Sequence, residues 1–241
     1  FPLSDSLGQD PLSGIGGTRH CDWWFTNKAV LIDTAGRYTT QDSHSEKDSK
    51  AWLGFLGLLK KYRTKRPING AIVAVSLVSL MSQTRTERGM HARAIKARIQ
   101  ELKNQLGMQF PIYIVFTKAD LIAGFNEYFA DLEDEERDQL LGFMFPESCD
   151  DEKGVISLFN KEFHHMLESL DKRMNKRLEQ ETDLDKRALI FEFPKQLRML
   201  QANADEFLSG IFAKNAFEES TMIRGVFVVS SVQEGMPIDR V

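Results

Sequence analysis

Three short runs of apolar residues constrain the fold of this chain more than any other feature of its sequence. They are GAIVAVSL, PIYIVF and GVFVV, which occupy 70–77, 111–116 and 225–229. Continuous apolar runs of this length, rich in β-branched residues and without polar alternation, are typical of strands that are buried on both faces. We therefore expect them to form the centre of one sheet.

A clear amphipathic helix separates the first two runs. Its apolar residues fall at steps of three and four, and a glycine suited to a C-cap follows them: Ala92, Ile95, Ile99, Leu102, Leu106 and then Gly107. Strands that alternate with helices indicate a mostly parallel sheet. The sequence thus predicts an α/β fold.

The region before the first run adds two short strands and one helix. CDWWFT and AVLI read as strands with a polar break at Asn27 and Lys28, and the adjacent Trp23 and Trp24 must point to opposite faces. Burying both tryptophans requires a sheet that is covered on both sides. Residues 45–62 read as a helix with an apolar stripe of Trp52, Phe55, Leu56 and Leu59.

The character of the chain changes after about residue 125. Residues 126–220 carry little strand signal, and the segments EYFADLEDEERDQLLGF and VISLFNKEFHHMLESLDKRMNKRLEQ read as helices. A third helical stretch runs from about 185 to 214, and Pro194 either starts it or kinks it. We therefore predict an α/β core at 1–125 and 221–241, and a helical subdomain at 126–220.

Composition narrows the classes of function. The net charge of −4 disfavours nucleic-acid binding, and no apolar run approaches the ~20 residues of a membrane helix. The two cysteines, Cys21 and Cys149, have no zinc-ligand spacing and are expected to be reduced thiols. The first residues lack the features of a signal peptide.

Three predicted strands end in polar residues that suit a ligand site. Asp33-Thr34-Ala35-Gly36 follows AVLI, Thr117-Lys118-Ala119-Asp120 follows PIYIVF, and Ser230-Ser231 follows GVFVV. In parallel α/β sheets, ligands bind beyond the carboxyl ends of the strands. Each sequence taken alone is also compatible with an ordinary turn, but their order and strand context together indicate a nucleotide site.

Each of these residues has a physical task in such a site. Asp33 suits the coordination shell of Mg²⁺, and Gly36 lets a backbone N–H approach a γ-phosphate without interference from a Cβ atom. Asp120 can accept two hydrogen bonds from the guanine edge, while the stem of Lys118 can lie along the base. The backbone N–H at Ser231 can meet the base O6.

Four segments resemble the IcmF/TssM family of type VI secretion inner-membrane proteins. They are GGTRHCDWWFTNKAVLIDTAGRYTTQDS, HARAIKARIQELKNQLGMQFPIYIVFTKADLIAGF, LLGFMFP and SSVQEGMPIDR, and together they span nearly the whole chain. The resemblance implies a cytoplasmic Ras-like P-loop NTPase domain with helical additions, located between membrane segments. It assigns Asp33 and Gly36 to the DxxG box, and Thr117, Lys118 and Asp120 to the base-reading box. Thr18 is then a candidate switch threonine for Mg²⁺.

Three departures from the family pattern limit this interpretation. The sequence contains no GxxxxGK[ST] motif, so we expect an N-terminally truncated core that binds nucleotide weakly or not at all. Arg37 stands where Ras-like enzymes have a water-orienting glutamine, and it either stabilises phosphate charge as a catalytic residue or pairs with a carboxylate. Thr117 replaces the usual asparagine, which leaves base specificity open.

The sequence therefore supports two hypotheses. The first is a nucleotide-dependent switch that uses Mg²⁺ and GTP or ATP in the intact protein, with hydrolysis by an attacking water. The second is a catalytically silent scaffold that docks other membrane-complex and baseplate subunits. Both place the chain at the cytoplasmic face of the bacterial inner membrane, anchored by segments outside this sequence, and 126–220 is the expected partner surface.

Overall fold

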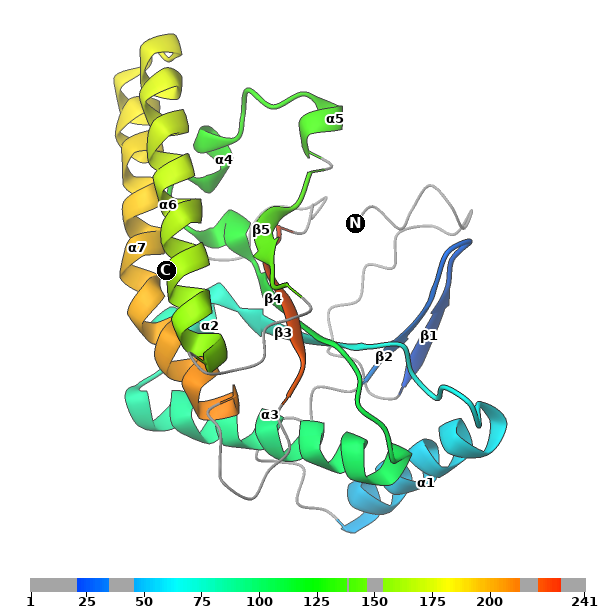
Figure 1. Ribbon diagram of the computed structural model, residues 1–241. Coiled ribbons are helices and arrows are strands. Elements are labelled where there is room, and N and C mark those ends of the chain that lie inside the picture. Colours follow the sequence, from blue (N-terminus) through cyan, green and yellow to red (C-terminus); the bar gives the residue numbers. More distant parts are fainter. Residues whose placement is uncertain (1–20, 35–45, 138, 147–153, 213–220, 231–241) are drawn as a thin grey trace. The chain divides into compact units, whose positions relative to one another are not determined.

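The computed structural model describes residues 21–34, 46–137, 139–146, 154–212 and 221–230 (Figure 1). The chain divides into two compact units, which are considered separately. Unit 1 comprises 1–67 and 93–108, and unit 2 comprises 68–92 and 109–241. The candidate boundaries at 125 and 221 do not coincide with this division, because the helices of the 126–220 block share unit 2 with the parallel strands.

Unit 1 contains an antiparallel hairpin of β1 (Asp22–Phe25) and β2 (Val30–Asp33). Thr26 organises its turn, because its hydroxyl oxygen accepts a hydrogen bond from the Ala29 N–H at 2.9 Å and its own N–H donates to the Ala29 carbonyl. This hairpin confirms the two predicted strands and the break at Asn27 and Lys28. Trp23 and Phe25 are exposed, so this hairpin does not bury both adjacent tryptophans.

Two helical segments complete the described part of unit 1. Helix α1 (Glu46–Tyr62) buries Trp52, Leu56 and Leu59 of the predicted stripe and leaves Phe55 half-buried. The Trp52 indole N–H donates to the Glu101 carboxylate at 3.0 Å. Glu101 lies in the second part of α3 (Arg85–Leu106), which ends as predicted at Gly107 with φ of 67°. The Gly107 N–H bonds the Lys103 carbonyl at 2.8 Å, as expected for a left-handed C-cap.

Unit 2 is built on a sheet with the strand order β3-β4-β6-β5. Strands β3 (Ala71–Ser76), β4 (Ile112–Thr117) and β6 (Ile223–Val228) are parallel, as the three apolar runs predicted. One face of the sheet is buried through Val75, Ile112, Ile114, Phe116, Val226 and Val228. The opposite face is only partly covered, since Ile72 and Ala74 of β3 are exposed.

A fourth strand corrects the sequence prediction. The segment predicted as one helix contains only the short helices α4 (Phe125–Tyr128) and α5 (Asp134–Arg137), followed by β5 (Leu141–Met144). Strand β5 pairs antiparallel with β6 at the sheet edge. The error arises at Gly142, which has φ of 154°. A Cβ atom there would collide with the Val226 carbonyl oxygen, so glycine lets β5 approach β6 closely. This pairing outweighs the helix preference of the segment.

Two long helices lie side by side and cover the buried face of this sheet (Figure 1). They are α6 (Gly154–Gln180) and α7 (Leu184–Phe212), and the carboxylate of Asp183 caps α7 by accepting from the Asp185 and Lys186 N–H groups. Pro194 lies buried inside α7, so it does not start that helix. Shorter segments are α2 (Leu77–Ser82) and the 3₁₀ turn η3 (Ala119–Leu121).

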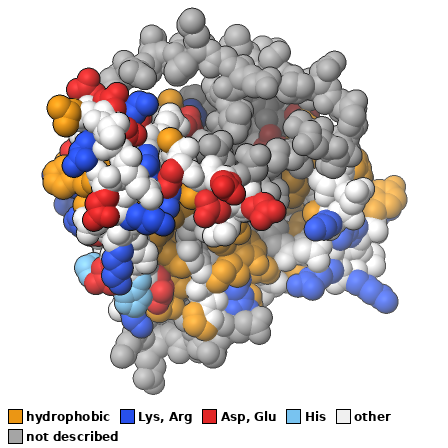
Figure 2. Space-filling view, turned by 90° about the horizontal axis from the view of Figure 1, so that it is seen from above, with side chains coloured by type: hydrophobic (Ala, Val, Ile, Leu, Met, Phe, Trp, Pro, Cys, Tyr) orange, Lys and Arg blue, Asp and Glu red, His pale blue; other side chains and the backbone are white. Residues whose placement is uncertain are grey.

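The surface carries charges of both signs. Figure 2 shows acidic and basic side chains on one face, with hydrophobic side chains reaching the surface between them. No helix among the described residues has both the length and the apolar character needed to cross a bilayer.

Candidate functional site

The parallel strands of unit 2 bring the polar residues at their carboxyl ends to one edge of the sheet. Ser76 of β3 pairs in register with Thr117 of β4, and Phe116 of β4 pairs with Val228 of β6. The segments that follow each strand therefore begin at the same level. Two of the three predicted strand tips, those after β4 and β6, belong to this edge.

The chain leaves β4 through a tight turn at Lys118. This residue adopts a left-handed conformation with φ of 62° and ψ of 38°, and it is the one non-glycine residue with positive φ in the described segments. Such a conformation costs an ordinary side chain about 1 kcal/mol or more. The turn directs the chain into η3 and leaves the Lys118 side chain exposed, while the neighbouring Ala119 is fully buried.

Two backbone hydrogen bonds fasten this turn to the end of β6. The Ala119 N–H donates to the Val229 carbonyl at 3.2 Å, and the Val229 N–H donates to the Phe116 carbonyl at 2.8 Å. The parallel ladder thus extends past both strands into the loops. The loops are therefore held by the sheet itself.

The side chains of Asp120 and Ser230 meet at this point. The Ser230 hydroxyl donates to Oδ1 of Asp120 at 3.0 Å across a half-buried contact. A hydrogen bond to a carboxylate is stronger than one between neutral groups, so it fixes the carboxylate orientation. A carboxylate has lone pairs for further donors, and Asp120 is therefore suited to accept the paired N–H groups of a purine edge.

The third parallel strand ends in a different way. The Ser76 hydroxyl accepts from the Ser79 N–H at 3.3 Å and caps α2, so this side chain serves the helix. Ser76 therefore lies at the same edge of the sheet, but its hydroxyl is used to cap α2.

Asp33 occupies the end of β2 in unit 1. It is exposed and lies directly opposite Asp22 in the hairpin register. Because Asp33 and Asp120 belong to different units, their approach to a common ligand stays a prediction. Four further candidates, Thr18, Gly36, Arg37 and Ser231, lie outside the described residues.

The segment after Asp120 is packed firmly against α7. Gly124 has φ of 82°, and a Cβ atom there would overlap the Leu189 carbonyl oxygen. Just beyond it, a cluster of aromatic rings has centroid separations of 4.8 to 5.5 Å: Phe125, Tyr128, Phe129 and Phe193. The buried Tyr128 hydroxyl donates to the Leu170 carbonyl at 2.6 Å, and burial raises the pKa of Tyr128 well above its ordinary value.

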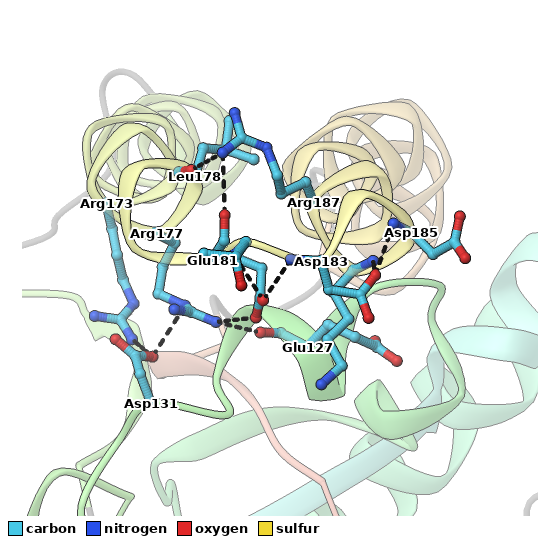
Figure 3. A network of polar contacts seen from close by, with 11 residues as sticks. Glu127, Asp131, Arg173, Arg177, Leu178, Glu181, Asp183, Asp185 and Arg187 are labelled. Carbon is cyan, nitrogen blue, oxygen red and sulfur yellow. Dashed lines mark hydrogen bonds and ion pairs between the residues drawn. The ribbon is translucent and has the colours of Figure 1, made fainter.

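Charged side chains of α6 hold the same segment from the other side (Figure 3). Arg173 and the buried Arg177 both pair with Asp131, and Arg177 also donates to the Glu127 carbonyl at 3.1 Å. Asp131 belongs to the acidic run DLEDEERD, for which the sequence alone favours a solvated helix face over a partner patch, whereas here its carboxylate pairs with α6. Helices α4, α6 and α7 therefore form one packed body with the loop that carries Asp120.

Sequence reasoning missed the contact of Asp120 with Ser230. It favoured Ser231 for a backbone contact, although Ser230 directly follows the apolar run and is the first polar side chain past β6. Parallel neighbours place such first polar residues next to each other, and this was the available signal. Among the described residues, no group of three or more His, Cys, Asp or Glu side chains is arranged to hold a metal.

Comparison with known proteins gives two matches. The sequence profile of the IcmF-related N-terminal domain matches residues 45–241. The type VI secretion system component TssM1 of Pseudomonas aeruginosa is 50% identical over 243 residues, which cover 100% of this chain and 22% of that protein. No solved structure matches the chain.

Proposed function

This chain belongs to the IcmF/TssM family of type VI secretion components, and we propose that it forms most of a nucleotide-binding switch domain. Its tasks are then to read the base with Asp120 and Lys118 and to support a metal ion with Asp33. The bond between Asp120 and Ser230 at the ends of two parallel strands is the observation that carries this proposal. An ordinary turn after β4 needs no oriented carboxylate.

The proposed domain has a Ras-like core. In support, the sheet of unit 2 is parallel except at one edge, and β3 at its other edge exposes Ile72. The hairpin of β1 and β2 also exposes apolar side chains on both faces. A further strand that carries a phosphate loop would cover the exposed edge of the sheet at β3, and this sequence holds no phosphate-loop motif. The relative is several times longer than this chain, so a neighbouring segment can supply the loop.

The chain's own residues have separate tasks in this proposal. Thr18 and Asp33 hold the Mg²⁺ shell, which supplies neutralisation of phosphate charge when the ion is bound. The Gly36 N–H approaches the terminal phosphate, and Ser231 offers its N–H to the base. Arg37 either neutralises charge on the phosphate or pairs with a carboxylate.

The experiment measures nucleotide affinity in the longer protein that includes a phosphate loop. Fluorescent GTP and ATP analogues are titrated against the parent, Asp120→Ala and Ser230→Ala. We expect Asp120→Ala to weaken the preferred nucleotide at least tenfold and Ser230→Ala to weaken it less, since a lost bidentate contact costs about 1–3 kcal/mol. Equal affinity in the parent and Asp120→Ala contradicts the base-reading role.

A base-swap variant sharpens this test. Asp120→Asn exchanges one acceptor oxygen for an N–H donor, so it should lose guanosine nucleotides and gain xanthosine nucleotides, whose C2 position carries an acceptor. An ATP-specific site would show no such exchange. The 241-residue chain alone should bind any of these nucleotides weakly, and micromolar affinity would show that the phosphate loop is dispensable.

A silent scaffold is the second candidate function. Arg37 in place of a water-orienting glutamine favours it, as does Thr117 in place of asparagine. Phosphate release by the longer protein, with Asp33→Ala as control, separates the two candidates. A rate that this substitution leaves unchanged removes the enzyme proposal and retains the scaffold.

We place the domain at the cytoplasmic face of the inner membrane, in contact with other type VI secretion subunits. Similarity to a type VI secretion system component supports this location, and the long helices α6 and α7 are additional to the sheet. Site-specific crosslinkers on α6 and α7 in intact cells test it. Crosslinks formed only from the hairpin of β1 and β2 would move the partner surface to unit 1.

A further inference from the structure

Helix α7 carries apolar side chains on the side that faces away from the sheet. Leu184 is 79% exposed, Met199 71% and Phe191 44%. With Ala188, Lys195 and Ala202, which are also exposed, these residues recur at steps of three and four and form one stripe, here called the outer stripe. It runs about 27 Å at a rise of about 1.5 Å per residue.

The outer stripe lies opposite the side of α7 that is already used for folding. The buried positions of the same helix include Ile190, Phe193, Leu197, Leu200 and Ala204. On a helix of 3.6 residues per turn, these positions point roughly half a turn away from the outer stripe. Packing within unit 2 therefore gives no reason for leucine, phenylalanine and methionine on the outer side.

The neighbouring helix shows what an ordinary solvent-facing side looks like in this molecule. The exposed positions of α6 are polar or charged throughout its middle: Lys161, His164, His165, Glu168, Ser169, Lys172, Asn175 and Lys176. His164 and His165 each lie beside a glutamate of the same helix. The exposed side of α6 is therefore polar where that of α7 carries large apolar side chains.

We propose that the outer stripe of α7 pairs antiparallel with the outer stripe of a second copy of this chain. A twofold axis at the level of Phe193 along the helix places large side chains of one helix opposite small side chains of the other. The offset between facing positions is at most one residue. Leu184 then faces Ala202 of the partner subunit, and Met199 faces Ala188 of the partner subunit. Such alternation of large and small residues lets two helices approach closely.

The charges along the stripe favour the same arrangement. Lys195 lies over the Phe191 ring, 3.7 Å from its centroid. The antiparallel pair places Lys195 against Phe191 of the partner subunit and beside Glu192 of the partner subunit. A parallel pair would instead bring Lys195 against Lys195 of the partner subunit, which repels. Arg198 forms an ion pair with Asp171 on α6 of the same subunit, so it does not add an unpaired charge to the proposed interface.

One helix pair buries less than the roughly 1,200 Å² of a stable interface, so the dimer should be weak in isolation. Sedimentation velocity over a concentration series of about 1 to 500 μM, in the range expected for such small interfaces, measures it. We expect a concentration-dependent dimer of the 241-residue chain. A monomer at every concentration overturns the proposal.

Substitutions then locate the interface. Phe191→Lys and Met199→Lys should each weaken dimerisation at least tenfold, while circular dichroism confirms folding because both side chains are exposed. Tyr62→Lys on α1, where the large side chain is 75% exposed, should leave the dimer unchanged. A dimer that tolerates both stripe variants is formed elsewhere and overturns the proposal.

A charge exchange and a crosslink test the direction of the helices. Lys195→Glu and Glu192→Lys should each weaken the dimer, and the double exchange should restore it. In a Cys21→Ser and Cys149→Ser background, Leu184→Cys combined with Ala202→Cys should form a disulfide-linked dimer. Strong linkage of Leu184→Cys alone would indicate parallel helices and overturn the antiparallel arrangement.

Discussion

The strand ends of unit 2 and the hairpin of unit 1 hold their predicted site residues on very different supports. Strand β4 alternates fully buried with half-buried side chains, and the loop after it is bonded to β6 through backbone and side chains. Strands β1 and β2 form a sheet of two, with Trp23, Phe25, Val30 and Leu31 exposed. Two-stranded sheets are marginally stable without further packing.

In the proposed function, this difference assigns a fixed role to one region and an adjustable role to the other. Asp120 is oriented before any ligand arrives, because Ser230 and the parallel ladder fix it. Asp33 stands at the end of an exposed strand, so its position depends on what else packs against the hairpin. A switch needs one fixed part and one adjustable part, and units 2 and 1 match these requirements in the proposed function.

The largest expected difference in stability between the two regions comes from adding one methyl group to a glycine in each. Gly124→Ala should destabilise unit 2 by more than about 3 kcal/mol, because Gly124 has positive φ and its new Cβ would overlap a backbone carbonyl. Gly54→Ala in α1 meets nothing within 4 Å and should stabilise its helix by about 0.5–1 kcal/mol. Urea unfolding measures both, and equal effects would contradict this contrast.

Side-chain truncation in one strand of each region gives the next largest contrast. Ile114 in β4 is 0% exposed, and Ile114→Ala should cost about 2–4 kcal/mol through lost burial and a cavity. Val30 in β2 is 44% exposed, and Val30→Ala should cost less than about 1 kcal/mol. Amide exchange of the parent protein offers an independent check, in which β1 and β2 should exchange much faster than β4.

Removing one tyrosine hydroxyl from each unit tests how much the packing of the segment after Asp120 contributes to stability. Tyr128→Phe deletes the buried bond to the Leu170 carbonyl and should cost about 1 kcal/mol. Tyr62→Phe on α1 alters an exposed ring and should change stability by less than about 0.5 kcal/mol. Thermal unfolding of both variants is sufficient, and a larger loss for Tyr62→Phe would refute the contrast.

The smallest expected effect concerns pH. Burial against Phe207 lowers the pKa of His91 below its ordinary value of 6.5. The unfolded chain then binds this proton at higher pH, so the contribution of neutral His91 is present above about pH 6.5 and is lost as the pH falls. Urea unfolding at pH 7.5 and 5.5 should show a decrease of about 1 kcal/mol or less in the parent.

One variant assigns that decrease. His91→Phe should reduce it. The glutamates whose pKa is lowered, such as Glu206 beside Arg88 and Arg85, titrate below this window because their ordinary value is 4.5. An undiminished pH dependence in His91→Phe would exclude His91 as its source.

Local periodicity was sufficient to predict most of the helices and the three parallel strands. The predicted runs at 70–77, 111–116 and 225–229 overlap β3, β4 and β6, and α3 ends at a glycine with the expected conformation. Strand β5 could not be predicted in this way. Its four residues include Gly142, and only pairing with a strand more than 80 residues later makes them a strand.

The site was predictable to the extent that it follows from strand order. Asp120 lies at the end of β4 as expected, because residues after parallel strands share one edge. The bond to Ser230 and the left-handed Lys118 depend on backbone conformation in loops, which apolar patterns do not encode. Exposure of Trp23 was also unpredictable, since a sequence shows residue type but not what covers it.

The position of β6 has a consequence for synthesis of the protein. This strand lies between β4 and β5, yet it is the last of the described strands in the chain. Until it leaves the ribosome, β4 and β5 have no common neighbour and keep unpaired edges that invite association between chains. A nascent chain stalled before Ile223 should therefore remain unfolded at its centre and depend on chaperones, even though both long helices are already complete.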